Sequence, residues 1–146
     1  MRVLTMIMAA AVPLAACASD DQRAAARAAA EAAAQLSADG QGYADGARFA
    51  GPARNCVPIN DLRQSRVRSD RVIDWSGGSG RTYRTVLPQS CPTLGFEQRF
   101  AYQTSLTQLC AQDIITVLQG PSAQPGPACA LAPFQPITPP PRAGLR

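Results

Sequence analysis

The segment RQSRVRSDRVIDWSGGSGRTYRTVL, residues 63–87, decides the fold of this chain. It is rich in β-branched and aromatic residues, which favour strands. Two turn signals divide it, Ser69-Asp70 and Gly77-Gly78-Ser79-Gly80. The pattern predicts an antiparallel meander with strands at 62–68, 71–76 and 81–87.

Three more segments of strand length follow the meander, at 99–105, 113–118 and 129–137. The middle one, DIITVL, is an apolar run typical of a strand buried on both faces. Pro133 and Pro136 favour an edge position for the last one. Short strands at this spacing predict an all-β fold, a small disulfide-braced barrel or half-barrel of about five to six strands over residues 56–137.

The chain contains five cysteines, and four of them lie in the predicted β domain: Cys56, Cys91, Cys110 and Cys129. An even number in an exported chain favours two disulfides. The alternative, a zinc site, lacks both a C-x-x-C pair and any histidine. Three pairings are open. Cys91 and Cys129 each begin a C-x4-F segment, and this shared spacing favours Cys91 with Cys129, leaving Cys56 with Cys110.

The N-terminus has the parts of a secretory signal peptide. Arg2 is followed by a short apolar stretch, which is less than the about 20 residues that a membrane span needs. The run Leu14-Ala15-Ala16-Cys17 resembles the lipobox of bacterial lipoproteins. That resemblance implies cleavage after residue 16, lipidation of Cys17 and anchoring to a membrane. Because Ala18 rather than Asp follows the cysteine, the resemblance implies the outer membrane. A periplasm-facing orientation is expected, with surface exposure as the alternative.

The regions outside the β domain differ in composition. Residues 17–37 are rich in alanine, the best helix former, and predict a helical tether that acts as a stalk. Residues 38–55 contain several glycines among scattered polar residues and are interpreted as a flexible linker. Residues 138–146 form a proline-rich tail.

Parts of the predicted domain resemble an uncharacterised family of small Gram-negative exported proteins. The similar features are Cys56, the CPTLGF of residues 91–96, the Asp113-Ile114-Ile115 strand opening and the CALAPFQPI that begins at Cys129. The family is a domain of unknown function, so the resemblance implies a fold and no activity.

The charged residues limit the chemistry. The chain has 14 arginines, no lysine and no histidine. The commonest general base is therefore missing, and no cofactor, metal site or catalytic residue is expected. The acids of the domain are Asp61, Asp70, Asp74, Glu97 and Asp113. A pair of carboxylates across a cleft could hydrolyse a cell-wall glycan, which is the alternative to a structural or binding role.

Seven arginines lie between residues 54 and 84, against three aspartates. Arg66, Arg68 and Arg84 are predicted to share one sheet face and to bind an anion. The candidate partners are peptidoglycan, lipopolysaccharide or an envelope protein, and nucleic acid is not expected. The alternative is a solvated sheet face with cross-strand pairs such as Asp74 with Arg84. Trp75 and Tyr83 are interpreted either as a stacking platform or, more simply, as packing residues.

Overall fold

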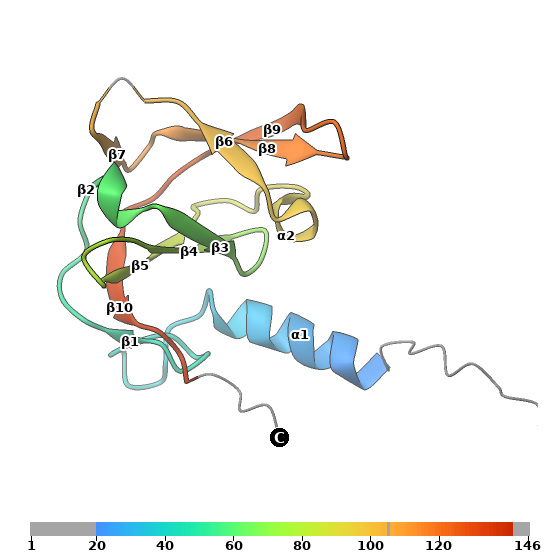
Figure 1. The fold of residues 1–146 in the computed structure, drawn as a ribbon. Helices are drawn as coiled ribbons and strands as arrows, with labels where there is room; N and C mark the ends of the chain where they lie inside the picture. Colours follow the sequence, from blue (N-terminus) through green and yellow to red (C-terminus); the bar gives the residue numbers. More distant parts are fainter. Residues whose placement is uncertain (1–19, 105, 142–146) are drawn as a thin grey trace, which may run out of the picture.

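The computed structural model describes residues 20–104 and 106–141 and is mostly β. The described residues form ten strands in three sheets, two α-helices and one 3-10 turn (Figure 1). In chain order these are α1 (Asp20–Ala32), β1 (Arg48–Phe49), β2 (Cys56–Pro58), the turn η1 (Ile59–Asp61), β3 (Gln64–Val67), β4 (Val72–Ser76), β5 (Thr82–Val86), α2 (Leu94–Glu97), β6 (Phe100–Tyr102), β7 (Gln108–Cys110), β8 (Ile114–Gln119), β9 (Gln124–Ala130) and β10 (Gln135–Thr138).

The main sheet has the order β1-β10-β5-β4-β3 and is antiparallel throughout. It contains the predicted meander, which is confirmed. Trp75 pairs with Tyr83, and Asp74 pairs with Arg84. Because side chains alternate along a strand, the two pairs lie on opposite faces of the sheet.

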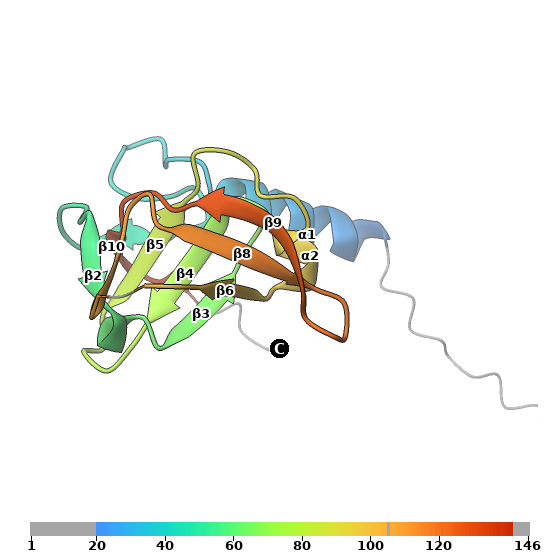
Figure 2. The same ribbon diagram turned by 90° about the horizontal axis from the view of Figure 1, so that it is seen from above.

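A second sheet, β6-β8-β9, lies over the main sheet as an upper layer (Figures 1 and 2). The core fills the space between the two layers. Trp75 from the main sheet meets Phe100 from the upper sheet, with ring centroids 5.4 Å apart in an edge-to-face arrangement. We call the face of the main sheet that points away from this core the outer face.

The strands form separate sheets rather than one closed barrel over the described residues, and they are shorter and more numerous than expected. The segment predicted as a single strand at 129–137 crosses between layers, so that it ends β9 in the upper sheet and forms β10 in the main sheet. The predicted edge position of β10 is wrong, because β10 lies between β1 and β5. Burial of β8 on both faces is also wrong, since Ile114 is exposed.

Two disulfides connect the layers and loops. Cys56 is bonded to Cys110 between β2 and β7, and Cys91 to Cys129 between the loop before α2 and β9. The expectation of two disulfides is therefore met, in the pairing that the C-x4-F spacing favours. The sheet formed by β2 and β7 was not predicted from the sequence, because each strand is only three residues long.

Residues 38–55 are folded, so the prediction of a flexible linker is wrong. Tyr43 and Ala47 are buried with Ile137 in a small second core on the outer face. Tyr43 packs edge-to-face on Phe49, and β1 pairs with β10. The glycines of this segment occupy turns, as Gly46 does with a φ of 92°, and do not mark a mobile chain.

The turn before β1 is held by Asp39. Its carboxylate accepts hydrogen bonds from the Ser37 hydroxyl, the backbone N–H of Gln41 and the Arg48 guanidinium. These hydrogen bonds, of which the one from Ser37 has the largest effect, hold the pKa of Asp39 well below its usual range. The β unit therefore begins well before residue 56.

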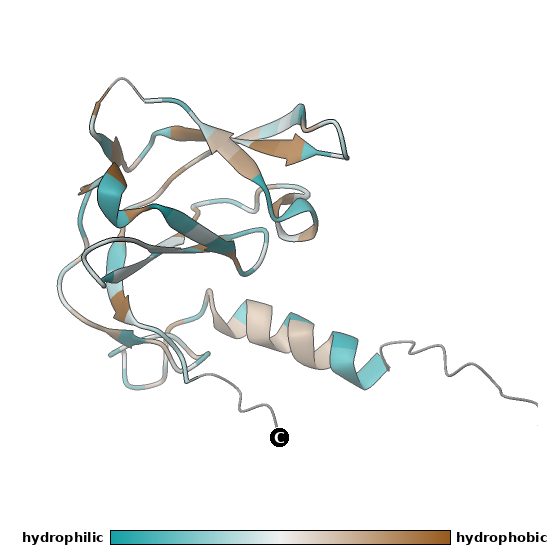
Figure 3. Ribbon diagram, viewed as in Figure 1, coloured by the Kyte–Doolittle hydropathy of each residue, from teal (hydrophilic) through white to brown (hydrophobic). Residues whose placement is uncertain are grey.

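α1 lies on the outer side of the main sheet, opposite the upper sheet (Figure 1). None of its residues is buried, and it lacks the strongly hydrophobic colour seen on β8 (Figure 3). The chain after it is anchored, because Ala33 is only 2% exposed. The helix is thus attached to the sheet at its C-terminal end.

Candidate functional site

The predicted anion-binding face can be located directly. The register of the meander places Arg66 opposite Asp74, and Asp74 opposite Arg84, in one row across β3, β4 and β5. The row lies on the outer face, as expected for a shared arginine face. The burial and the partners of the three arginines then decide whether they can hold an external anion.

Arg84 is fully buried, so the prediction that it binds an external anion is wrong. Its Nε donates to Asp74 Oδ1 at 2.7 Å, and its Nη2 donates to Asp74 Oδ2 at 3.0 Å. Its Nη1 donates to Asp45 Oδ1 at 2.9 Å and to the Ala33 carbonyl at 3.2 Å. The guanidinium also lies 4.7 Å from the ring centroid of Tyr43.

The charges in this cluster stabilise one another. Burial is the largest single influence on the pKa of Asp45 and raises it. The hydrogen bonds from Arg84 and from the Ala47 N–H, together with the charges of Arg84 and Arg68, outweigh burial, so the pKa of Asp45 is lowered. Burial would likewise lower the pKa of Arg84, but its bonds to Asp74 and Asp45 raise it. Both groups are therefore charged near neutral pH, and each compensates the other.

The other two predicted residues differ from each other. Arg68 Nε lies 2.8 Å from Asp74 Oδ2 and is committed to that carboxylate. Arg66 is exposed and forms no ion pair with any described residue. The Asp74–Arg84 cross-strand pair that the sequence offered as the alternative is present, although it is buried rather than solvated.

A groove of about 1110 Å³ separates α1 from the outer face. Alanines of the helix form one wall, and Arg66 and Arg68 lie along the other. Asp45 and Asp74 also line it. Both carboxylates are bound by Arg84, so neither is arranged as a proton donor for glycan hydrolysis.

Three further acids of the domain bind the backbone. Asp70 Oδ1 accepts a hydrogen bond from the Gly95 N–H at 2.6 Å, and Asp113 Oδ2 accepts one from the Cys110 N–H at 2.7 Å. Glu97 accepts from the Gly120 N–H. Such bonds hold turns and leave these carboxylates committed to structure.

Trp75 is a packing residue rather than a stacking platform. It is 1% exposed, and its ring packs against Phe100, Tyr102 and Phe134. Its Nε1 donates to the Thr85 hydroxyl at 3.2 Å. The simpler of the two interpretations therefore holds for Trp75.

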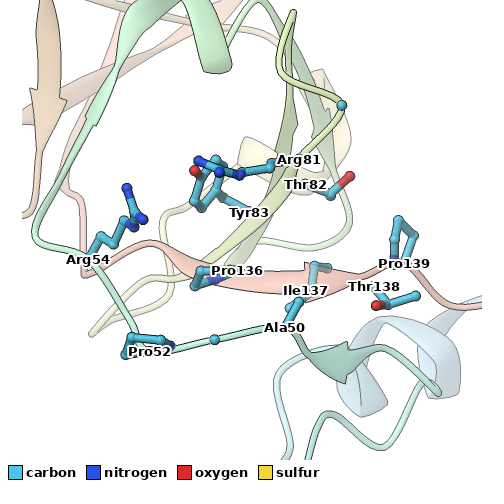
Figure 4. A pocket seen from close by; sticks show the side chains of 12 residues that line it. Ala50, Pro52, Arg54, Arg81, Thr82, Tyr83, Pro136, Ile137, Thr138 and Pro139 are labelled. Carbon is cyan, nitrogen blue, oxygen red and sulfur yellow. The ribbon is translucent and has the colours of Figure 1, made fainter.

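A second, smaller cleft lies at the end of the main sheet, between the segment at residues 50–54, β10 and the start of β5. Its volume is about 460 Å³. Figure 4 shows Arg54 and Arg81 entering it from opposite walls and pointing toward one another, with the Tyr83 side chain at the guanidinium end of Arg81 in this view. No aspartate or glutamate is among the residues that line this cleft.

The position of each of these side chains follows from strand register. Arg81 and Tyr83 are two residues apart, so they lie on the same face. Arg54 is brought opposite them by its bridge to Phe134, in which each backbone N–H donates to the other's carbonyl at 2.8 Å. Both guanidiniums are exposed, and neither has an ion-pair partner among the described residues.

Tyr83 adds an unusual feature to the cleft. The residue is fully buried, and its hydroxyl is the one buried side-chain polar atom in the described part of the chain that lacks a hydrogen-bond partner. An unpaired buried polar group costs about 1 to 3 kcal/mol. This donor lines the same cleft as two arginines that form no ion pair within the described residues, and the combination is the clearest sign of a ligand site in that part of the chain.

Arg54 and Arg81 belong to the arginine cluster at residues 54–84, but they were not among the three arginines predicted to bind an anion. For Arg81, the sequence signal that could have identified it as a site residue is its position two residues before Tyr83, on the same strand face. No local signal exists for Arg54, because Arg54 and Arg81 meet only through the pairing of residue 54 with Phe134 and of β10 with β5.

Two further properties concern the described residues only. Residues 20–104 and 106–141 contain no group of three or more metal-ligating side chains arranged around one point. No helix within those ranges is long and apolar enough to cross a bilayer. The predicted signal peptide and Cys17 lie outside the described residues.

Comparisons with known protein families, with curated proteins and with solved structures find no match to this chain.

Proposed function

We propose that this protein is a lipoprotein of the outer membrane, periplasm-facing, that binds an anionic component of the cell envelope without transforming it. The lipobox-like run ending at Cys17 supports the anchor. In this proposal α1 is the stalk between the lipid and the β domain.

One observation carries the binding role: Arg54 and Arg81 point toward one another in a cleft that contains no acid (Figure 4). Two like charges that converge repel each other. An anion between them would convert that repulsion into two charge-assisted interactions. The candidate partners remain peptidoglycan, lipopolysaccharide and an acidic envelope protein.

The alternative, a glycan hydrolase, has less support. Asp45 and Asp74 are the carboxylates that share a groove, and both are neutralised by Arg84. We therefore propose binding rather than hydrolysis.

The test is sedimentation of detergent-solubilised full-length protein with peptidoglycan sacculi, and its association with lipopolysaccharide, at low and high salt. Binding through exposed charge should weaken steeply with salt, since the Debye length falls from about 10 Å at 0.1 M to about 3 Å at 1 M. The double variant Arg54→Gln/Arg81→Gln should lose binding.

The matched control is Arg63→Gln/Arg66→Gln, which removes the same charge from exposed positions outside the small cleft. It should bind as the wild type does. Equal loss in both double variants would show that general basicity, rather than the cleft, attracts the polymer. Absence of binding to both polymers and to envelope proteins in a crosslinking experiment would refute the proposed function.

A further inference from the structure

We propose that the cleft formed by Arg54, Arg81 and Tyr83 binds a phosphate monoester, with Tyr83 as the residue that selects it over a carboxylate. This inference rests on the proposed anion-binding function and names the ligand chemistry of the same site. Three properties of the cleft point to it: its charge, its number of donors and its size.

The charge of the cleft matches a dianion. Two guanidiniums line it, and no acidic residue does. A carboxylate carries one negative charge and would leave one arginine uncompensated. A phosphate monoester carries about −1.5 to −2 at pH 7 and compensates both.

The donors match three terminal oxygens. Arg54 and Arg81 approach from opposite walls, and each guanidinium can hold phosphate oxygens through paired N–H groups. The Tyr83 hydroxyl, which has no hydrogen-bond partner among the described residues, supplies a third donor at a separate position. A phosphate monoester presents three terminal oxygens, whereas a phosphodiester presents two and a carboxylate presents two.

The size and walls of the cleft suit a small group attached to a larger molecule. Its volume of about 460 Å³ lies within the range of roughly 300 to 1,000 Å³ that is usual for small-molecule sites. Pro52, Pro136 and Pro139 line it beside the arginines and offer apolar contacts to whatever carries the phosphate.

Access to the hydroxyl requires a side-chain movement. Tyr83 is shielded from solvent, whereas Arg81 is an exposed residue that directly follows the glycine-rich turn at 77–80. Rotation of the Arg81 side chain onto the bound phosphate would open the path to Tyr83. Exposed side chains change rotamer within nanoseconds, so this step does not limit binding.

The experiment measures affinities of the full-length protein in detergent by calorimetry, with glucose 6-phosphate, dimethyl phosphate and acetate as probes. Glucose 6-phosphate should bind at least tenfold more tightly than the other two. Its affinity should fall below about pH 6, where a phosphate monoester gains a proton. Vesicles containing phosphatidic acid, compared with soluble glucose 6-phosphate, distinguish a lipid-borne from a soluble source of the same group.

Three variants locate the site. Tyr83→Phe should lower the affinity for glucose 6-phosphate about tenfold or more, because a hydrogen bond to a charged group is lost. It should leave the melting temperature unchanged or higher, since the hydroxyl that it removes has no hydrogen-bond partner in residues 20–104 and 106–141. Arg81→Gln should weaken binding similarly, and Arg66→Gln should not.

Each remaining outcome is decisive. Equal affinity for acetate, or an unchanged affinity in Tyr83→Phe, would overturn the phosphate assignment. If peptidoglycan still binds in a manner that depends on Arg54 and Arg81, the proposed anion-binding function stands without the phosphate assignment. If Arg54→Gln and Arg81→Gln change the binding of no anion, both proposals are wrong.

Discussion

Arg84 and Asp74 lie opposite each other on β5 and β4 and form a bidentate ion pair, at 2.7 and 3.0 Å, with the arginine fully buried. The same guanidinium reaches Asp45 and the Ala33 carbonyl. One arginine therefore connects the centre of the main sheet to the segment that follows α1. This contact, together with the burial of Tyr43 and Ala47 against Ile137, makes residues 33–47 part of the β unit.

The first prediction concerns this buried arginine. Arg84→Met should lower the free energy of unfolding by about 3 to 5 kcal/mol, because it leaves Asp74 and Asp45 without their buried partner. Urea denaturation measures the loss. The control is Arg48→Gln, which breaks the exposed pair with Asp39 and should cost at most about 1 kcal/mol. A loss of unfolding free energy below about 1 kcal/mol in Arg84→Met would contradict the structural role given to Arg84.

The second prediction follows from the lowered pKa of Asp45. A carboxyl whose pKa is lower in the folded chain than its unfolded value of 3.8 contributes stability above that value. The contribution is lost as the pH falls from about 4 toward the folded pKa. Unfolding midpoints should therefore decline below about pH 4, and Asp45→Asn should decline less steeply while being less stable at pH 7. A variant with the acid profile of the wild type would exclude Asp45 as a source of the decline.

The third prediction concerns the disulfides. Replacing both cysteines of either pair with serine should cost about 2 to 5 kcal/mol. The bridges close loops of 54 and 38 residues, and loop entropy alone makes these differ by only about 0.3 kcal/mol. Denaturation of the two double variants should therefore give similar losses. Free thiols on the folded wild type, detected by alkylation, would disprove both bridges.

The fourth prediction concerns the turn between β4 and β5. A Cβ on Gly77 would overlap the backbone of Asn60 and Asp61, whereas one on Gly78 would meet no atom nearer than 3.9 Å. Gly77→Ala should cost about 1 to 3 kcal/mol through overpacking. Gly78→Ala should change stability by no more than about 0.5 kcal/mol. Thermal unfolding of the pair checks this contrast, and equal stability of the two variants would count against the close approach.

The fifth prediction concerns the anchor. Cys17→Ser should abolish labelling by a fatty-acid analogue in cells and leave an unprocessed precursor, because the proposed lipid attaches to the Cys17 thiol. Gel mobility and labelling measure both effects. The control is Cys56→Ser, which removes a thiol that the structure places in a disulfide and should label normally. Normal labelling of Cys17→Ser would remove the basis for a lipoprotein.

The meander could be predicted because its signals are local. Strand-forming residues and two turns stand within one segment, and the register follows from the turns. The number of disulfides was likewise available from the cysteines, and the favoured pairing agrees with the bonded pairs.

The folded state of residues 38–55 could not be read from composition, because its causes are distant in sequence. Glycines there form turns, and Tyr43 is buried only because β10 and β5 supply the surface beneath it. The burial of Arg84 has the same origin: its partner Asp45 lies 39 residues earlier. An arginine on a strand otherwise favours solvent, and the prediction for Arg84 failed for that reason.

The folding of residues 38–55 also limits how far the β domain can move relative to α1. As a glycine-rich coil, such a segment would let its ends separate by about 20 to 25 Å in any direction. With the segment packed on the sheet, α1 becomes an arm of 13 residues, about 20 Å long, that leaves the domain at a fixed point beside Ala33. A lipid at Cys17 would then hold the cleft of Arg54 and Arg81 within a narrow layer above the bilayer. Ligands confined to the same layer would meet the cleft at a higher local concentration.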